Sequence, residues 1–410
     1  MIKRIFFVLF ILGAFYQTTA AQRQSLLVAP AATDPNITIN LNNHYVSINR
    51  TAAPKNRLFV FLPGTGGVAV NYLEVNQTAA DLGFHAVNLT YPNDDAVNTL
   101  CGAPNVDLDC YAKVRLETLD GVDRTPLVTV SRANSIENRL IKLLIYLRNQ
   151  FPADNWGQFL IDDATPDWSK IVVAGHSQGG GHAGIIGRYH AVARVVMFAA
   201  MDFNGLANSP ANWIAHPETT PNATPPERFR GFCHQRDEQV NFTLLTTRIW
   251  PAYGMPAAGA VVNVDTTAPP YNDTHSLTSN IECDNFHGCI AADARLVRVD
   301  GVPVYKPVWE YLLSNIVSPL SVGTVRFLRF GTMIDRPPVG ASAKSYQLLA
   351  TGAGFDATAR AAINGVDVAT EFVDAATLRV RLPAGRIGAA GRSTLQIRNQ
   401  TGAVSNVLTF

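Results

Sequence analysis

The sequence predicts an α/β domain, built on a mostly parallel sheet with helices on both faces, followed by a small all-β domain. Two observations predict this order. Between residues 57 and 200, continuous apolar runs of strand length alternate with stretches of helical periodicity, which is typical of a sheet buried on both faces. Over residues 325–410 the pattern changes to short strands that alternate apolar and polar side chains.

Length and composition indicate the number of domains and exclude some classes of protein. The chain has 410 residues, which predicts two or three domains. Its formal charge is +1 and its apolar share is 47%, so neither a disordered chain nor a nucleic-acid-binding surface is indicated. We therefore expect no nucleic-acid partner.

The first residues indicate export. Lys3 and Arg4 precede an apolar run over residues 5–15, and small residues follow at 19–21. This is the pattern of a secretory signal peptide, predicted over residues 1–21. The run is too short for the ~20 residues that span a bilayer, so no stable membrane span is expected. The mature protein is predicted to be secreted, periplasmic or attached to the cell surface.

Four apolar runs are predicted to be buried strands, and each ends where a loop begins. They are residues 57–62 (RLFVFL), 84–89 (FHAVNL), 170–174 (KIVVA) and 193–200 (ARVVMFAA). Ligands of open parallel sheets bind at the carboxyl ends of the strands. The functional residues should therefore lie in the loops that follow these runs.

The first domain is predicted over residues 22–318. Two further segments within it have informative sequences. Residues 134–152 place Ile136, Leu140 and Leu144 on one helix face, and Asn134 and Glu137 have the spacing of a capping pair. Residues 203–226 are too rich in Pro and Asn for one regular element. This second segment is either a lid over a pocket or a plain surface excursion.

The predicted C-terminal domain covers residues 325–410. LRVRL at 378–382 and LQIR at 395–398 have the period of half-buried antiparallel strands. Together with GAGFD at 352–356, INGVDV, LPAG and the closing SNVLTF, they resemble IPT/TIG domains, which are immunoglobulin-like β-sandwiches of secreted proteins. The resemblance implies a module without chemistry of its own, available for contact with a surface or a glycan.

The strongest functional pattern is AGHSQGG at residues 174–180. Gly175 and Gly179 flank Ser177 at the spacing of a sharp strand-to-helix turn that exposes a serine hydroxyl. KIVVA before it is a good buried strand, and the small residues after it allow a helix to start close to the sheet. Over residues 55–315 the order of parts resembles the α/β-hydrolase superfamily, in which this serine is the nucleophile of esterases and lipases.

A serine nucleophile needs a base and an acid that orients the base. The resemblance implies that the acid follows a later strand, which selects Asp237 after RFRGFC, with Asp202 as the alternative. His275 and His287 compete for the role of base. We favour His287, because a bridge between Cys283 and Cys289 would restrict the loop around it.

The developing oxyanion needs two preorganised N–H donors. The amide of Gln178, directly after the nucleophile, is one candidate. PGTGG after the first buried strand resembles the oxyanion loop of esterases and lipases, and it offers the amide of Thr65 or Gly66, of which we favour Thr65. A nucleotide phosphate loop is the rival interpretation, but its lysine and hydroxyl residue are missing here.

The five cysteines suit an exported chain. Cys101 and Cys110 bracket one short loop, and Cys283 and Cys289 bracket another, which leaves Cys233 over, although sequence alone does not assign the pairing. No Cys-x-x-Cys pair is present to indicate a metal site. His176 and His182 are six residues apart, which does not align two ligands on one helix face.

These observations predict an exported serine hydrolase that cleaves ester-like acyl bonds of a small-molecule or polymeric substrate through an acyl-enzyme. Its catalytic residues are Ser177, Asp237 and His287, with Gln178 and Thr65 in the oxyanion hole, and it requires no metal or cofactor. The alternative is a catalytically silent protein that binds surfaces through its β domain.

Overall fold

The computed structural model describes residues 23–314, 321–329, 332–334, 345–374, 376–385, 392–399 and 404–410. The predicted signal peptide at 1–21 lies outside them. The buried apolar side chains fall into two separate clusters, one between Val28 and Leu313 and the other between Val322 and Ile397. The described residues therefore build two hydrophobic cores, one before and one after residue 320.

The first core surrounds a mixed nine-stranded sheet with the order β1-β2-β4-β3-β7-β8-β11-β13-β12. In that order the strands are β1 (Arg23–Val28), β2 (His44–Asn49), β4 (His85–Asn88), β3 (Leu58–Leu62), β7 (Ile171–His176), β8 (Arg194–Phe198), β11 (Phe229–His234), β13 (Ser276–Ser279) and β12 (Val262–Asn263). β1, β2 and β4 pair antiparallel, and from β4 to β12 every pair is parallel. This architecture fits the α/β-hydrolase fold.

The four predicted apolar runs form β3, β4, β7 and β8, and every residue of these strands is buried. A parallel strand covered on both faces has no polar side, which explains why its sequence is a continuous apolar run. Because β3, β7, β8 and β11 run parallel side by side, the loops that follow them meet at one edge of the sheet.

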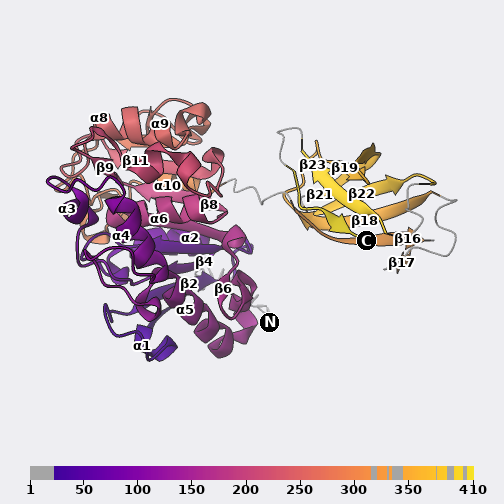
Figure 1. The fold of residues 1–410 in the computed structure, drawn as a ribbon, viewed down its shortest axis with the longest axis horizontal. Coiled ribbons are helices and arrows are strands. Elements are labelled where there is room, and N and C mark those ends of the chain that lie inside the picture. Colours follow the sequence, from indigo (N-terminus) through magenta and orange to yellow (C-terminus); the bar gives the residue numbers. More distant parts are fainter. Residues whose placement is uncertain are drawn as a thin grey trace, which may run out of the picture.

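Figure 1 shows the helices packed around the sheet. α2 packs against α10, whereas α4 packs against both α5 and α6. Their bounds are α2 (Leu73–Asp81), α4 (Cys110–Asp120), α5 (Ile136–Gln150), α6 (Gln178–Tyr189) and α10 (Lys306–Leu312).

The helix predicted after residue 134 is α5, but its predicted cap is wrong. Ser135, not Asn134, is the N-cap, and its hydroxyl accepts from the Asn138 amide at 3.3 Å. The Asn134 side chain instead accepts from the Thr38 amide at 2.9 Å, in a different segment. Both residue types make good N-caps, so this tertiary contact decides between them.

Residues 203–226 contain no long element, as expected. They form β9 (Phe203–Asn204), β10 (Ser209–Pro210) and α7 (Asn212–Ala215), with single turns of 3₁₀ helix. Trp213 and Ile214 are buried, and α7 packs against α4. This packing ties the segment to the helical layer.

The strands after residue 320 form two antiparallel sheets with the orders β17-β16-β18-β22-β21 and β20-β19-β23-β24. They are β16 (Ser321–Arg329), β17 (Thr332–Ile334), β18 (Tyr346–Ala353), β19 (Arg360–Ile363), β20 (Val366–Val368), β21 (Thr370–Asp374), β22 (Thr377–Leu382), β23 (Thr394–Arg398) and β24 (Leu408–Thr409). Burial alternates along β22 and β23, as their sequences predict, and Leu378, Val380, Leu395 and Ile397 enter the second core. None of these strands joins the nine-stranded sheet.

Among the described residues, no helix has the length and apolar character needed to cross a membrane.

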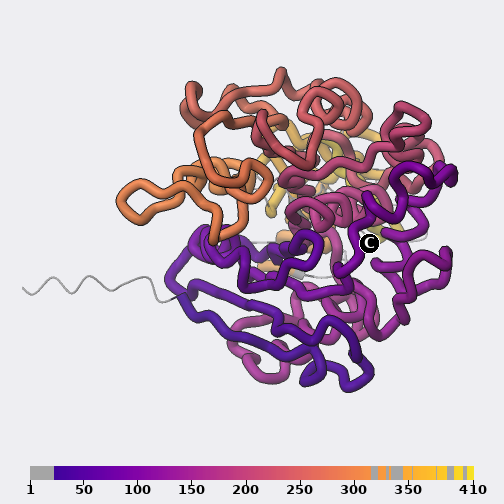
Figure 2. The backbone as a smooth tube through the Cα atoms, turned by 90° about the vertical axis from the view of Figure 1, so that its left-hand side faces the viewer, coloured from indigo at the N-terminus to yellow at the C-terminus, as the bar shows by residue number. Residues whose placement is uncertain are grey.

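Figure 2 shows the orange chain near residue 300 beside the indigo chain that leads into α2. Two contacts make this approach: the Asp293 carboxylate accepts from the Leu73 amide at 2.6 Å, and Arg298 pairs with Glu74 at 2.9 Å.

Candidate active site

Ser177 lies on a strained turn between β7 and α6. Its backbone has φ 55° and ψ −121°, a conformation that residues with a Cβ rarely adopt. The flanking glycines are required by space: a Cβ on Gly175 would lie 2.3 Å from Gly179 C, and one on Gly179 would lie 2.0 Å from Leu62 O. The spacing noticed in the sequence thus reflects a turn in which strand and helix backbones nearly touch.

The strain at this turn leads to a stability prediction. Ser177→Gly should be more stable to unfolding than Ser177→Ala by about 1 kcal/mol, because both variants lack the hydroxyl and only Ala keeps the Cβ that disfavours a positive φ. Urea titration followed by Trp fluorescence measures this, since all five Trp lie between residues 156 and 309. As the control, Ala183→Gly inside α6 should lose stability. Equal stability of the two Ser177 variants would contradict the strain.

Asp237 and His287 form a buried hydrogen-bonded pair. Asp237 follows β11 and His287 lies in the loop after β13, and His287 Nδ1 is 2.9 Å from Asp237 Oδ2 and 3.0 Å from Oδ1. Their side chains are 0% and 6% exposed. The amides of Gln239 and Val240 both donate to Asp237 Oδ1 at 2.8 Å. These donors hold the carboxylate in place beside the ring of His287.

The pairing determines which nitrogen of His287 can act as a base. A carboxylate only accepts, so Nδ1 carries the proton and Nε2 of the neutral ring is left with a lone pair. Nε2 is buried and has no hydrogen-bond partner among the described residues. It is therefore available to take a proton from another group.

Ser177 and His287 line the same pocket, with a volume of about 210 Å³. Thr65 and Gln178 line it as well, so four of the five predicted site residues meet there and the fifth, Asp237, lies behind His287. The remaining lining comes from Ala96 and α3 (Val97–Cys101), from Arg115 on α4, and from the loops after β8 and β11. The pocket thus opens where the parallel strands end, as the sequence led us to expect.

In the loop after β3, the amides of Thr65 and Gly66 differ in whether they already donate a hydrogen bond. The Gly66 amide donates to Asn93 O at 2.9 Å and is already used. The amides of Thr65 and Gln178 have no acceptor among the described residues, and Gln178 is the first residue of α6, where an N–H has no intrahelical acceptor. Thr65 Oγ1 donates to Gln178 Oε1 at 2.7 Å, which links the two candidate donors.

Asp202, the alternative acid, is held by other residues. It forms a buried bidentate pair with Arg115, both contacts being 2.5 Å, and it also accepts from Trp213 Nε1 at 3.2 Å. Arg115 in turn donates to Gln178 O at 2.9 Å. Asp202 therefore neutralises a cation that supports the start of α6.

His275, the alternative base, lies just before β13. Burial and the charges of Arg230 and Arg194 lower its pKa to about 3. Arg194 begins β8 at the amino end of the sheet, so His275 lies in a cation-rich environment away from the pocket, which it does not line. Its ring resists protonation there.

Glu238 is a site residue that the sequence analysis did not identify. Its carboxylate accepts from the His287 amide at 2.7 Å and from the Phe286 amide at 2.9 Å. Glu238 thus fastens the backbone of the loop that carries His287, next to the Asp237 that holds its ring. The adjacent acidic pair in the loop after β11 was the available signal.

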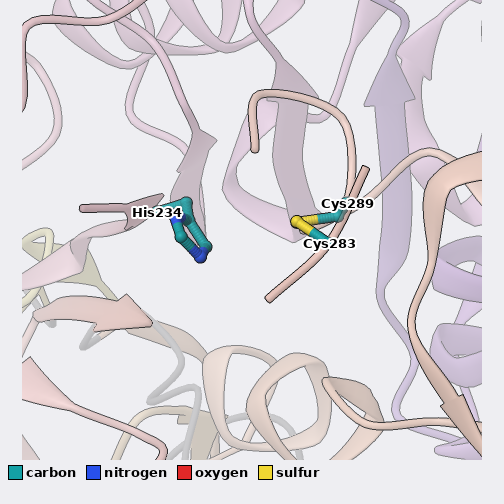
Figure 3. Close-up of side chains that lie close together, drawn as sticks. All are labelled: His234, Cys283 and Cys289. Atoms are coloured by element: carbon teal, nitrogen blue, oxygen red, sulfur yellow. A yellow bond between two sulfur atoms is a disulfide. The ribbon is translucent and has the colours of Figure 1, made fainter. Parts of the chain in front are cut away.

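The cysteines pair as their spacing suggested: Cys101 with Cys110, and Cys283 with Cys289, leaving Cys233 as a buried free thiol. Cys283 and Cys289 lie close to His234 in a group that resembles a metal site (Figure 3). However, the two sulfurs are bonded to each other, and both ring nitrogens of His234 are engaged, by Ile281 O at 2.8 Å and the Arg236 amide at 3.1 Å. The group has no donor left for an ion.

No protein-family model matches the chain, and no curated protein matches it either. Among solved structures, a putative dienelactone hydrolase from Klebsiella pneumoniae has 13% identity and a TM-score of 0.35, over 70% of this chain and 95% of its own. An acetyl xylan esterase from Aspergillus awamori has 10% identity and a TM-score of 0.31, over 57% and 77%. A bacterial heroin esterase has 15% identity and a TM-score of 0.26, over 65% and 77%. Likeness at this level does not assign an activity.

Proposed function

We propose that the protein is an exported serine hydrolase that cleaves ester-like acyl bonds through an acyl-enzyme. The observation that carries this proposal is the buried Asp237–His287 pair, whose free Nε2 belongs to the same small pocket as Ser177. A hydroxyl is a weak nucleophile until a base accepts its proton, and the base works best when a carboxylate orients it.

The proposed reaction gives a role to each of the five residues. Ser177 Oγ attacks the ester carbon while His287 Nε2 takes the hydroxyl proton, and Asp237 stabilises the imidazolium that forms. The carbonyl oxygen becomes an oxyanion and accepts from the amides of Gln178 and Thr65. Loss of one such donor costs about 3 to 4 kcal/mol in other hydrolases. His287 then protonates the leaving alcohol. In the second half of the reaction, a water gives a proton to His287 Nε2 as it attacks the acyl-enzyme, and His287 returns that proton to Ser177 Oγ as the acid leaves.

The C-terminal sheets play no part in this chemistry. No residue of theirs lines the pocket described here. We propose that they form an appended IPT/TIG-like module that contacts a surface or a glycan, on the strength of the sequence motifs and the two antiparallel sheets. The catalytic proposal does not depend on that identification.

Pre-steady-state hydrolysis of p-nitrophenyl acetate tests the proposal. We expect a burst of p-nitrophenol close to one equivalent of enzyme, followed by a slower steady rate, because the alcohol leaves before the acyl-enzyme is hydrolysed. Mass spectrometry of acid-quenched protein should locate the acetyl group on the peptide that contains Ser177. A folded protein that hydrolyses neither this ester nor a thioester would refute the proposed activity.

The pocket predicts a preference for short acyl groups. Its volume of about 210 Å³ lies below the ~300–1,000 Å³ of sites that hold drug-sized ligands. Its apolar lining residues are Ala96, Val97, Ala199, Met201 and Val240. Across p-nitrophenyl acetate, butyrate and octanoate, kcat/KM should therefore fall, by at least about tenfold from acetate to octanoate, since forcing extra methylenes into a filled space costs about 1 to 3 kcal/mol.

Met201→Ala provides the matched test of this size limit. Removing the Met201 side chain from the lining should shift the preferred ester toward butyrate without changing Ser177 or His287. If octanoate proves as good a substrate as acetate for the unmodified protein, the pocket does not limit the acyl group.

A further inference from the structure

Tyr72 and His176 are two buried polar residues with no role in the reaction described above. Tyr72 is the N-cap of α2 and is 5% exposed, and His176 is the last residue of β7 and is 4% exposed. His176 directly precedes Ser177, and its ring centroid lies 4.7 Å from that of His287. Both residues therefore lie directly behind the proposed catalytic groups.

A continuous chain of hydrogen bonds runs through these two side chains. The Gly64 amide donates to Tyr72 Oη at 3.3 Å, Tyr72 Oη lies 3.1 Å from His176 Nδ1, and His176 Nε2 lies 2.8 Å from His287 O. The chain begins beside Thr65 in the oxyanion loop and ends on the backbone of the proposed base. It joins three segments that are far apart in the sequence.

The direction of each bond follows from the groups involved. A backbone carbonyl only accepts, so His176 Nε2 carries a proton and donates to His287 O. Burial, and then the nearby His287, lower the pKa of His176 to about 3, so the ring is neutral and its Nδ1 is an acceptor. Tyr72 must therefore donate to Nδ1 while it accepts from Gly64. Each member has one defined orientation, which fixes the tautomer of His176.

We propose that Tyr72 and His176 are positioning residues that set the oxyanion loop and the base loop at fixed distances from the nucleophile. The inference rests on the proposed function and deepens it. His176 continues the strand that carries Ser177, so any group bonded to its ring is placed relative to the nucleophile. Through Nδ1 and Tyr72 it holds Gly64, next to the Thr65 donor, and through Nε2 it holds the backbone of His287.

Close packing makes this arrangement sensitive to small changes. A Cβ on Gly64 would lie 3.2 Å from Ser177 Cβ and 3.3 Å from His176 Nδ1, so the oxyanion loop already touches both residues. The rings of Tyr72 and His176 also pack against each other, with centroids 5.6 Å apart. A shift of about 1 Å in a catalytic group can cost about a hundredfold in rate, so losing one bond of the chain should reduce turnover.

Tyr72→Phe and a pair of His176 variants test the proposal. Tyr72→Phe removes one oxygen and should lower kcat for p-nitrophenyl acetate about tenfold or more, with KM changed less than twofold. His176→Asn keeps an acceptor near Nδ1 but loses the donor to His287 O, whereas Gln reaches further and can replace that donor. We therefore expect His176→Gln to retain at least about fivefold more activity than His176→Asn.

Two control variants remove similar contacts away from the pocket. Tyr45→Phe loses hydroxyl bonds to Ser25 and Gln77, and His85→Asn loses the bond from Nε2 to Asp154 O. Tyr45 and His85 are 7% exposed, and neither lines the pocket. Both controls should keep the unmodified kcat, even where they lower the melting temperature.

Titration with a fluorophosphonate counts competent sites, so kcat is expressed per reactive serine and loss of folded protein does not imitate loss of positioning. An unchanged kcat per site in Tyr72→Phe, or a His176→Asn variant as active as His176→Gln, overturns the positioning role while leaving the hydrolase intact. If His176→Asn does not fold, Tyr72→Phe decides alone. An inactive, unlabelled wild type would overturn the proposed function, and this inference with it.

Discussion

Ser177→Ala is expected to lower kcat for p-nitrophenyl acetate by at least about 10⁴-fold and to abolish labelling by a fluorophosphonate. The serine oxygen is the atom that first attacks the ester carbon in the proposed reaction, and removal of a hydrolase nucleophile leaves just the catalysis due to binding and the oxyanion donors. In Ser177→Ala the amides of Gln178 and Thr65 remain, so residual hydrolysis above the uncatalysed rate is expected.

Ser135→Ala is the matched control for this experiment. Ser135 is also a buried serine at the start of a helix, where its hydroxyl accepts from the Asn138 amide. Its loss should cost about 1 kcal/mol of stability and leave both turnover and labelling unchanged. Equal labelling of the wild type and Ser177→Ala would show that another residue reacts with the probe and would remove Ser177 from the mechanism.

The parts of the fold that the sequence predicted well are those whose physical cause is local. β3, β7 and β8 are buried on both faces, so each is a continuous apolar run that one short window reveals. The turn at Ser177 is equally local, because the spacing of Gly175 and Gly179 follows from contacts within the turn and with the adjoining strand. The two disulfides are also local features, because each one closes a short loop.

The choice between Asp202 and Asp237 was not local, and the sequence left it open. Both residues follow neighbouring parallel strands, β8 and β11, so both reach the same edge of the sheet. They differ in what approaches them: Arg115 on α4, 87 residues before Asp202, occupies that carboxylate, whereas His287 reaches Asp237. Partners at such separations leave no periodicity in the sequence.

Other site residues could not be predicted from the sequence for the same reason. Glu238 bonds the His287 amide across 49 residues, and His176 joins Tyr72 across 104 residues and His287 across 111. In the sequence, His176 and His182 are six residues apart, which is not the spacing of a metal pair on one helix face, and no local pattern indicates another role for His176. Its two hydrogen bonds exist because the sheet brings the loops after β3, β7 and β13 to one edge.

Replacing the two candidate bases separately should give opposite results. His287→Ala is expected to lower kcat by about 10⁴-fold or more, because Ser177 then has no acceptor for its proton and Asp237 has lost its partner. His275→Ala should keep kcat within about threefold. The reason is electrostatic as well as geometric: the pKa of His275 is lowered to about 3 by burial and by the charges of Arg230 and Arg194, so its neutral ring does not take up a second proton near neutral pH.

Steady-state rates with p-nitrophenyl acetate, expressed per folded protein, distinguish the two candidate bases, and the pH dependence adds a second criterion. Because the pKa of His275 is about 3, its titration would place the acid limb of the rate profile near pH 3 if it were the base. Activity that falls in His275→Ala but persists in His287→Ala would overturn the assignment of His287. Such a result would also leave the buried Asp237–His287 pair without a catalytic role, because nothing else in the described pocket offers Ser177 an oriented imidazole nitrogen.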